Sequence, residues 1–415
     1  MSEIIEKYKE VAGSEAIDQI YQLAEPLKNI KITHVNSTLM GGGVAEILSK
    51  MVPLTEAFGI STQWEVIHGP PEFYQCTKDF HNALQGNRTL IPASRLEVFE
   101  AVNKNNAETL RPILENSDVV FIHDPQPIAM ISHFPDRKGK WIWRCHIDAN
   151  KPFWPVWKYV SQFAARYDAS VFSLVKFIHY LPHPMFIIPP SIDPLSEKNI
   201  ELEQKEIDQV RELFGIDSKR PLLLQVSRYD RFKDPVGVIE AYRLAKKYNP
   251  DIQLALAGGD ASDDPEGEAV LNEVKRAASN DPDIHILLLP SNAHRTINAL
   301  QRSADIILQK SIKEGFGLTV TEALWKGKPV IAGNTGGIKL QIINKQTGFI
   351  VNTPEGAAYR IRQLLQNPQI GRETGLLGRE YVYDKFLITR HLRDYLSVIY
   401  SLMFEESDRI ELSPR

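Results

Sequence analysis

The sequence predicts an α/β protein with two doubly wound domains, each built on a parallel sheet. Short apolar, β-branched runs recur along the 415 residues, and amphipathic helical patterns separate them. This alternation is typical of parallel sheets made of βαβ units. The runs form two successive sets, and the length fits two or three domains at roughly 150 residues each.

The first set predicts six strands, at 30–35, 64–67, 119–122, 141–147, 169–172 and 186–188. Helical patterns such as 44–56 and 105–115 lie between them. The second set predicts six more strands, at 222–226, 252–257, 284–289, 306–308, 330–331 and 349–351. Their intervening helical patterns include 236–247, 268–279 and 321–326.

The link between the sets is expected at 189–208, where a Pro-Pro-Ser segment is followed by a charged stretch. The last helical pattern places apolar residues on one face. They are Ile388, Leu392, Tyr395, Leu396, Ile399 and Met403. In two-domain folds of this kind such a helix often crosses back to the first domain. We therefore expect an N-terminal domain at 1–200, completed by a C-terminal helix at 386–415, and a C-terminal domain at 201–385.

Composition narrows the class of function. The formal net charge is −4 with both signs spread along the chain, which argues against a nucleic-acid or membrane-surface binder. The only two cysteines, Cys76 and Cys145, are far apart and signal neither a disulfide framework nor a zinc site. The N-terminus is polar, and no apolar run approaches the ~20 residues that span a bilayer. We expect a cytoplasmic enzyme.

The segment KEGFGLTVTE at 313–322 is the strongest functional signal. It separates Glu314, in a glycine-rich loop, from Glu322, inside the helix that the loop opens. Glycines let a backbone approach a ligand closely, and helix N-termini favour anions. Glu314 can accept hydrogen bonds from sugar hydroxyls, and Glu322 from ribose hydroxyls. The donor-binding candidates here are Gly315, Phe316, Gly317, Leu318, Thr319 and Glu322.

A structural alternative exists for the second glutamate. The pattern Thr319-x-x-Glu322 also fits a capping box, which satisfies helix N–H groups and needs no ligand. Glu314 has no comparable structural duty, because it stands between an apolar strand and a glycine loop. The sequence alone leaves both interpretations of Glu322 open.

Three further segments follow predicted strands, where open α/β sheets bind ligands. The loop SRYDRFKD at 227–234 carries Arg228 and Lys233, two cations suited to a diphosphate, although a solvated basic turn would look the same. The first strand leads into a glycine loop in which Gly42 and Gly43 can turn N–H groups toward a phosphate or sugar. A tight structural turn is the alternative there. Gly258 ends another strand on the same side.

Polar residues also cluster at two strand ends of the first domain. HDPQ at 123–126 and RCHID at 144–148 should lie at neighbouring strand ends. His146 could hydrogen-bond a donor hydroxyl, although a lone histidine at a strand end is more often structural. The candidates for an acceptor-sugar pocket are Asp124, Gln126, Arg144 and Asp148.

Taken together, these segments resemble the retaining glycosyltransferases of family four. That family includes glycogen-synthase-like and sucrose-synthase-like enzymes and has the GT-B fold, two Rossmann-like domains with an interdomain cleft. The matching residues are the E-x7-E pair Glu314 and Glu322, the diphosphate-binding pair Arg228 and Lys233, and the glycine-loop residues Gly42 and Gly43. The segments HVNSTLMGGGVAEIL, IHDPQP and WRCHID are similar to those of trehalose glycosyltransferring synthases. The resemblance extends over nearly the whole chain.

The resemblance implies transfer of glucose from a uridine, adenosine or guanosine diphosphate glucose to free glucose, giving α,α-trehalose reversibly. Glu322 would bind ribose and Glu314 the donor glucose, while Arg228 and Lys233 would stabilise the leaving diphosphate and His146 would touch the donor sugar. Such enzymes are usually given a front-face displacement that retains anomeric configuration. Closure of the two domains near 189–208 would exclude water.

Other functions remain open from the sequence. No Asp-x-Asp motif stands at a strand end in suitable company, so no tightly bound metal or cofactor is expected, and loosely held Mg²⁺ on the nucleotide is compatible. The partners would be a nucleotide-sugar donor and a small sugar acceptor, without nucleic acid or membrane. The alternatives are a family four transferase with a different acceptor, a phosphorylase-like enzyme, and a non-catalytic nucleotide-sugar sensor. The oligomeric state is unreadable, and a homodimer fits as well as a monomer.

Overall fold

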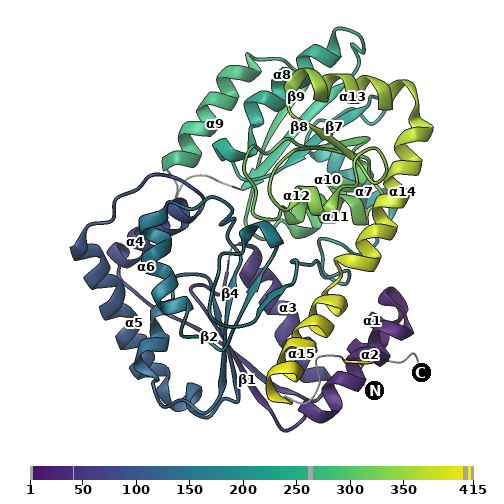
Figure 1. Cartoon of the computed structure of the whole chain (residues 1–415). Coiled ribbons are helices and arrows are strands. Elements are labelled where there is room, and N and C mark those ends of the chain that lie inside the picture. The colour runs from purple at the N-terminus through teal and green to yellow at the C-terminus, as the bar shows by residue number, and fades with distance from the viewer. Residues whose placement is uncertain (1–2, 41, 260–264, 405–409, 413–415) are drawn as a thin grey trace. The chain divides into compact units, whose positions relative to one another are not determined.

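The computed structural model describes residues 3–40, 42–259, 265–404 and 410–412, and these divide into two compact units (Figure 1). Unit 1 contains residues 1–190 and 388–415, and unit 2 contains residues 191–387. Each unit is built on one six-stranded sheet whose described strand pairs are all parallel. The predicted fold class, two doubly wound α/β domains, is confirmed.

The sheet of unit 1 has the strand order β2-β1-β3-β4-β5-β6. Its strands are β1 (Lys31–Asn36), β2 (Ser61–Val66), β3 (Val119–His123), β4 (Lys140–Cys145), β5 (Ala169–Phe172) and β6 (Met185–Ile187). Each occurs where the sequence predicted a strand. The helices are α1 (Glu3–Ala12), α2 (Ser14–Ala24), η1 (Glu25–Leu27), α3 (Gly43–Ala57), α4 (Pro71–Leu84), α5 (Ala93–Leu114), η2 (Ile128–His133), α6 (Trp154–Ala164), η3 (Val175–Phe177) and α15 (Ile388–Met403).

The sheet of unit 2 has the strand order β12-β11-β10-β7-β8-β9. Its strands also match the six predicted ones: β7 (Leu222–Val226), β8 (Gln253–Gly259), β9 (Ile284–Leu289), β10 (Ile306–Gln309), β11 (Val330–Gly333) and β12 (Phe349–Val351). The helices are α7 (Gln204–Leu213), η4 (Arg231–Lys233), α8 (Pro235–Lys246), α9 (Pro265–Ala278), α10 (His294–Ser303), α11 (Leu318–Trp325), α12 (Ile338–Gln341), α13 (Pro354–Gln366) and α14 (Pro368–Lys385).

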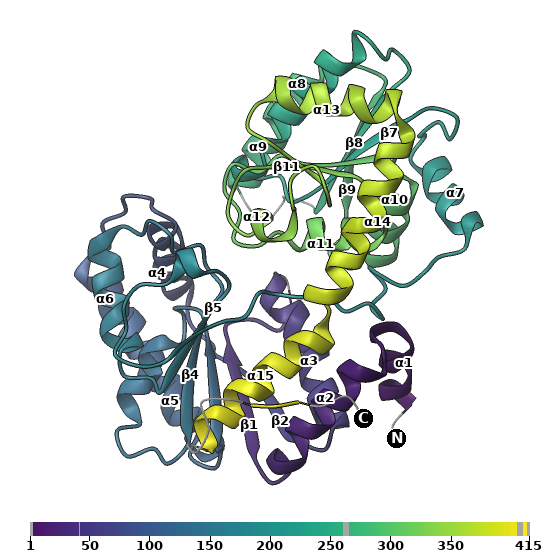
Figure 2. The same ribbon diagram turned by 45° about the vertical axis from the view of Figure 1, so that its right-hand side comes forward.

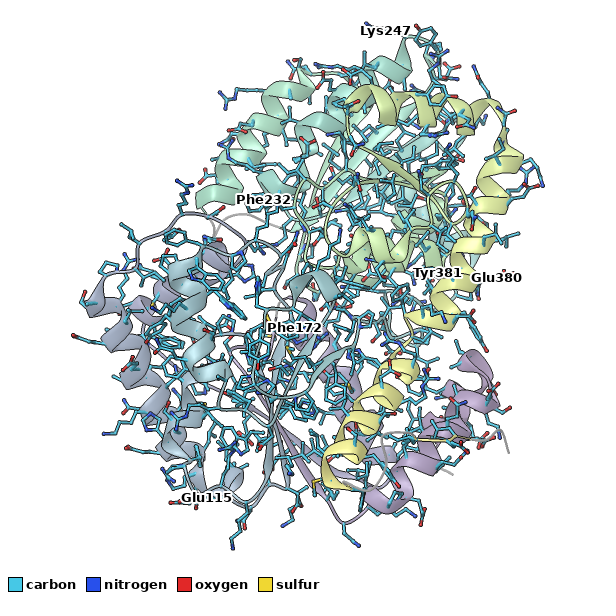
Figure 3. The ribbon with its side chains drawn as sticks, viewed as in Figure 1. Glu115, Phe172, Phe232, Lys247, Glu380 and Tyr381 are labelled. Carbon is cyan, nitrogen blue, oxygen red and sulfur yellow. The ribbon has the colours of Figure 1, made fainter. Side chains whose placement is uncertain are left out.

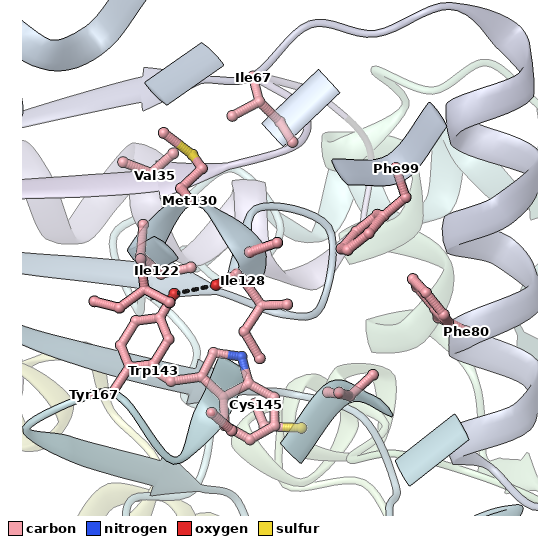
Figure 4. Packing of buried hydrophobic residues seen from close by; sticks show 14 of the residues in the cluster. Val35, Ile67, Phe80, Phe99, Ile122, Ile128, Met130, Trp143, Cys145 and Tyr167 are labelled. Carbon is pink, nitrogen blue, oxygen red and sulfur yellow. Dashed lines mark hydrogen bonds between the residues drawn. The ribbon is translucent and has the colours of Figure 1, made fainter. Parts of the chain in front are cut away.

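The central strands are nearly continuous runs of apolar residues because both faces of each sheet are covered. Every residue of β3, β5 and β7 is buried, as expected for parallel strands between helical layers. In unit 1, Trp143 and Ile122 lie in one apolar cluster (Figure 4). Tyr167 belongs to the same cluster, and its hydroxyl donates to the Ile128 carbonyl at 2.8 Å, so its polar end is satisfied.

The last helix of the chain belongs to the first sheet's unit. Five of the six apolar residues predicted for one face of α15 are buried, and Met403 is half-buried. The helix lies beside α2 in both views, yellow against purple (Figures 1 and 2). Tyr395 reaches the sheet, where its ring stacks on Phe121 of β3 with centroids 4.9 Å apart. Residues from the end of the chain therefore complete the cover of β1 and β3.

Each sheet has a point at which its strand order reverses. In unit 1 this point lies between β1 and β3, and in unit 2 between β7 and β10. Chain segments leave these strand pairs in opposite directions, and open α/β sheets bind ligands beyond the carboxyl ends of the strands at such a point. The segments that follow these four strands include the glycine loop, the 123–126 segment, the 227–234 loop and the 313–322 segment.

Candidate active site

In unit 2 the loops after β7 and β10 bring Lys233 and Glu314 together. The Nζ atom of Lys233 lies 2.6 Å from Oε2 of Glu314, and the two side chains are 17% and 10% exposed. Ser311 Oγ donates to the same carboxylate oxygen at 3.4 Å. Two residues 81 positions apart thus form one partly buried, charge-assisted pair at the switch point of the sheet.

The position of Lys233 follows from a sharp turn after it. Asp234 has a left-handed backbone (φ 50°) and caps α8, because its Oδ1 accepts from the Gly237 N–H at 3.2 Å. Lys310, at the end of β10, pairs with the same Asp234 carboxylate. Gln225 of β7 donates through Nε2 to the Lys233 carbonyl at 2.8 Å. Both strands at the switch point therefore hold the lysine loop in place.

The glutamate loop needs glycines at two places. Gly317 has φ +86° and forms the N-cap of α11, a conformation that side chains with a Cβ rarely adopt. Gly336 has φ +42°, and a Cβ there would lie 1.5 Å from the Glu314 carbonyl oxygen. The Gly337 N–H donates to the Gly315 carbonyl at 3.2 Å. Backbone segments 314–317 and 336–337 are thus in direct contact.

The structure decides against the capping-box interpretation of Glu322. The N-cap of α11 is Gly317 rather than Thr319, and no side chain caps this helix end. Glu322 is 1% exposed, and its Oε1 lies 3.7 Å from the Nζ of Lys198. A buried carboxylate needs such a counter-charge.

The sequence did not predict that two lysines lie near Glu322. Lys326 is 7% exposed, and its Nζ donates to Asn199 Oδ1 and to the Glu322 carbonyl, each at 3.1 Å. Burial lowers the pKa of Lys326 to about 7, while the Glu322 charge opposes that shift. The i,i+4 spacing of Glu322 and Lys326 was a readable signal. Lys198, 124 positions before Glu322, gave none.

The surroundings of the other donor-site candidates do not by themselves point to a ligand. The Arg228 side chain is 77% exposed and lies 3.6 Å from Asp230 Oδ2. A Cβ at Gly258 would lie 2.3 Å from the Ser227 carbonyl oxygen, so packing alone explains that glycine. Gly42 has φ +82° and precedes α3, and Gly43 begins that helix. Phe316 is buried against Phe386, and Gly315, Leu318 and Thr319 surround the start of α11. Gly41 lies outside the described residues.

In unit 1, Asp124 and His146 lie together at the ends of β3 and β4. The Asp124 backbone is left-handed (φ 63°), and its Oδ1 accepts from the His146 backbone N–H at 2.7 Å. Burial raises the pKa of Asp124 to about 6, although the His146 N–H and the Arg144 charge counteract it. Asp148 is half-buried, and its Oδ1 accepts from the Asn150 N–H at 3.1 Å.

Gln126 and Arg144 differ in burial and in hydrogen bonding. Gln126 is half-buried, and among the described residues its Oε1 has no hydrogen-bond partner. Arg144 is 0% exposed, and its Nη2 donates to Ser173 Oγ at 3.3 Å and to the Ile188 carbonyl at 2.8 Å. Among the described residues its Nε and Nη1 have no hydrogen-bond partner, so contact of Arg144 with an acceptor sugar stays a prediction.

His146 is the last member of a chain of three histidines that the sequence reasoning missed. Nδ1 of His34 lies 3.0 Å from Nε2 of His123, and Nδ1 of His123 lies 3.0 Å from Nε2 of His146. Burial lowers the pKa of His34 to about 3 and the pKa values of His123 and His146 well below the usual range. All three rings are therefore neutral at physiological pH.

Neither metal-binding clusters nor membrane-spanning helices occur in the described parts of the chain. No three of the described His, Cys, Asp and Glu side chains gather as metal ligands would. No described helix is both long enough and apolar enough to cross a bilayer. Cys76 and Cys145 are both free and buried.

Models of known protein families match parts of both units. The family model described as "Trehalose synthase, N-terminal domain" matches residues 34–179, and "Glycosyl transferases group 1" matches residues 206–376. The trehalose synthase of Pyrococcus horikoshii is 44% identical over 96% of both chains, and that of Rubrobacter xylanophilus is 40% identical over 95% of this chain and 96% of its own.

Solved structures confirm the GT-B fold. The α,α-trehalose-phosphate synthase of Burkholderia xenovorans, at 14% identity, covers 90% of this chain and all of its own with a TM-score of 0.74. The sucrose-phosphate synthase of Thermosynechococcus elongatus, at 16% identity, has a TM-score of 0.70 and covers 91% of this chain and all of its own. Because the described strands form two doubly wound parallel sheets and trehalose synthases are 40% and 44% identical over nearly the whole chain, the chain belongs to the trehalose synthase family of glycosyltransferases.

Proposed function

We propose that this glycosyltransferase makes α,α-trehalose by moving glucose from a nucleoside diphosphate glucose to free glucose, reversibly and with retention of configuration. The observation that carries the proposal is the ion pair of Lys233 and Glu314, 2.6 Å apart beside the N-terminus of α11. It joins a cation for a phosphate to a carboxylate for sugar hydroxyls at the point where parallel sheets bind ligands.

In the proposed reaction the bond between C1 of glucose and the β-phosphate oxygen breaks, and its electron pair leaves with the phosphate. Lys233 and the N–H groups at the start of α11 stabilise the growing negative charge. The acceptor hydroxyl oxygen bonds to C1 on the face that the phosphate leaves, and its proton passes to that phosphate. No protein carboxylate attacks C1, so the residues act by positioning and by charge.

Arg228 supplies a second cation for the diphosphate. Its side chain is 77% exposed and only loosely paired with Asp230 at 3.6 Å, so a diphosphate can recruit it at small cost. Lys233, in contrast, is held before any donor binds, by the Gln225 bond to its carbonyl and the Glu314 pair at its Nζ. Arg228 should therefore affect donor affinity more than Lys233 does.

Glu322 binds the ribose in this proposal. Its carboxylate has Lys198 on one side and Lys326 nearby, so the ribose hydroxyls would replace part of the Lys198 contact. In unit 1 we assign the acceptor glucose to Asp124, Gln126, Arg144 and Asp148. Among the described residues the buried Oε1 of Gln126 has no hydrogen-bond partner, which supports this, because such an atom calls for a donor and a sugar hydroxyl supplies one.

The proposal is tested by incubating the purified enzyme with uridine, adenosine or guanosine diphosphate glucose and a set of acceptors. Released nucleoside diphosphate and the sugar product are measured, and NMR of the product reports the anomeric configuration. Trehalose formed with glucose, and lost in Glu314→Gln, is the expected result. Lys247→Met is the control, because Lys247 is exposed at the periphery of unit 2 (Figure 3).

The other outcomes are equally informative. Turnover only with glucose 6-phosphate, or only with some other acceptor, would overturn the assignment to free glucose and leave the transferase. Nucleotide binding without turnover on any acceptor would favour a sensor. Supplying trehalose and nucleoside diphosphate together tests the reverse direction by the appearance of nucleotide-sugar.

A further inference from the structure

The three hydrogen-bonded histidines of unit 1 come from three adjacent strands. His34 lies on β1, His123 ends β3, and His146 follows β4. The ring centroids are 5.3 Å apart at both steps, and the planes of the second pair differ by only 16°. His34 and His123 are 3% and 2% exposed, whereas His146 is half-buried. The chain therefore runs from the core of the unit to the edge where the candidate site lies.

The surroundings of the chain oppose protonation of any ring. Burial is the largest cause for all three, and the Arg144 charge acts in the same direction on His123 and His146. A fourth buried imidazole, His391 of α15, lies nearby and is neutral for the same reason, with Arg390 and Arg144 adding to the effect. The Asp124 carboxylate faces the chain at the His146 backbone N–H.

A chain of neutral imidazoles has only two arrangements of its protons. Each neutral ring carries one N–H, so it donates through one nitrogen and accepts through the other. If His34 donates from Nδ1, His123 must donate from Nδ1 and His146 must carry its proton on Nδ1. If His146 donates from Nε2, all three rings carry Nε2–H. The tautomer of one ring therefore fixes the other two.

We propose that His34 and His123 are positioning residues that set the tautomer and ring orientation of His146, and through it decide whether Nδ1 of His146 donates to or accepts from a sugar hydroxyl. The contact of His146 with sugar rests on the proposed function, but the coupling of the three tautomers does not. His34 reaches this role without touching substrate, since His123 stands between it and His146.

The coupling is tested first in the unmodified enzyme. With ¹⁵N-labelled histidine, the ring nitrogens of His34, His123 and His146 are assigned by single replacements, and their shifts report which nitrogen carries the proton. The expected result is the same tautomer in all three rings. Opposite tautomers in His34 and His146 would overturn the proposal, whether or not the enzyme makes trehalose.

The effect on catalysis is tested with His34→Phe, which can keep the ring stacked on Phe121 but removes the bond to His123. The ¹⁵N shifts of His146 should change, and kcat should fall about tenfold with little change in KM, as with other losses of an orienting partner. His34→Asn can restore a polar atom near Nδ1 and should recover part of the loss.

The matched control is His183→Phe in the same unit. His183 Nε2 makes a 2.7 Å hydrogen bond to Ser170 and is not one of the three hydrogen-bonded histidines. That variant should leave the His146 shifts and kcat unchanged. A His34→Phe enzyme with an unchanged His146 tautomer and the kcat of the control would overturn the proposal. If trehalose synthesis itself is absent, only the proposed function fails, because the tautomer measurement needs no substrate.

Discussion

Replacing Gly336 with alanine should disable the proposed donor site by moving the Glu314 loop. The new Cβ would lie 1.5 Å from the Glu314 carbonyl oxygen, whereas real Cβ atoms do not approach closer than 3.0 Å, so the two backbones must separate by about 1.5 Å. Neither can yield by rotating a side chain. The segments are also joined by the bond from Gly337 N–H to Gly315 and by one from Thr335 Oγ1 to the Ile312 carbonyl at 3.1 Å.

The magnitude follows from the sensitivity of catalysis to geometry. A misplacement of about 1 Å costs roughly 100-fold in rate, which corresponds to about 2.7 kcal/mol of transition-state stabilisation. Since the displaced loop carries Glu314, the partner of Lys233, kcat/KM for the proposed trehalose synthesis should fall at least that far. The assay is the initial rate of nucleoside diphosphate release with glucose as acceptor.

The control is Gly356→Ala at the start of α13, where the nearest atom to a new Cβ is 3.6 Å away. Circular dichroism and a thermal melt should show that both variants fold. A folded Gly336→Ala enzyme within about threefold of the control would refute the reasoning. It would mean that the 336 side relaxes and that the observed position of Glu314 is not required.

Three further predictions concern single charges. Lys233→Met should lower kcat by about 100- to 1000-fold with nucleotide affinity largely kept, and a fall in affinity alone would contradict its proposed role at the leaving phosphate. Burial lowers the pKa of His34 to about 3. The contribution of its neutral ring to stability is therefore fully present above about pH 6.5 and is lost as the pH falls from there toward 3. Urea unfolding should show about 2 kcal/mol more loss between pH 7 and pH 5 in the unmodified chain than in His34→Phe, and equal losses would contradict this. Asp283 accepts from Arg220 at 2.6 Å and from Lys246 at 2.8 Å, which lowers its pKa, so Asp283→Asn should cost about 1–2 kcal/mol at pH 7, and this cost should shrink as the pH falls below the ordinary Asp pKa of about 3.9 toward the lowered pKa of the folded protein. A cost that does not shrink over that range would place the effect in packing rather than charge.

The strands of this protein could be predicted because their signal is local. A strand buried on both faces reads as a short run such as the Leu-Leu-Leu-Gln-Val of β7, whatever lies beside it. The order of the strands in each sheet is not local. That β1 lies against β3, and β7 against β10, depends on how the crossover helices pack. The sequence therefore predicted loops at strand ends without showing that those after β7 and β10 would meet.

The same distinction separates the glutamates of one motif. Glu314 was predicted to have a ligand role because its own loop offers no structural duty, and the structure adds a lysine partner 81 positions away. For Glu322 the local pattern suggested a capping box, but Gly317 in a left-handed conformation begins the helix instead. The partner that decides its environment, Lys198, belongs to a segment with no periodic signal at all.

Arg144 shows why position along a strand is insufficient to predict how deeply a side chain is buried. Arg144 and His146 are two residues apart, so they share one direction of the alternating pattern, yet only His146 lies beyond the end of β4. The face on which Arg144 lies is covered by α15, whose Tyr395 stacks on Phe121 of the neighbouring strand. A helix that begins 244 residues later thus covers this face, and burial is the largest cause that lowers the pKa values of the three histidines. The polarity of the site edge in unit 1 is consequently a property of the last helix as much as of the strands, and substitutions in α15 should change the chemistry of His146 without touching it.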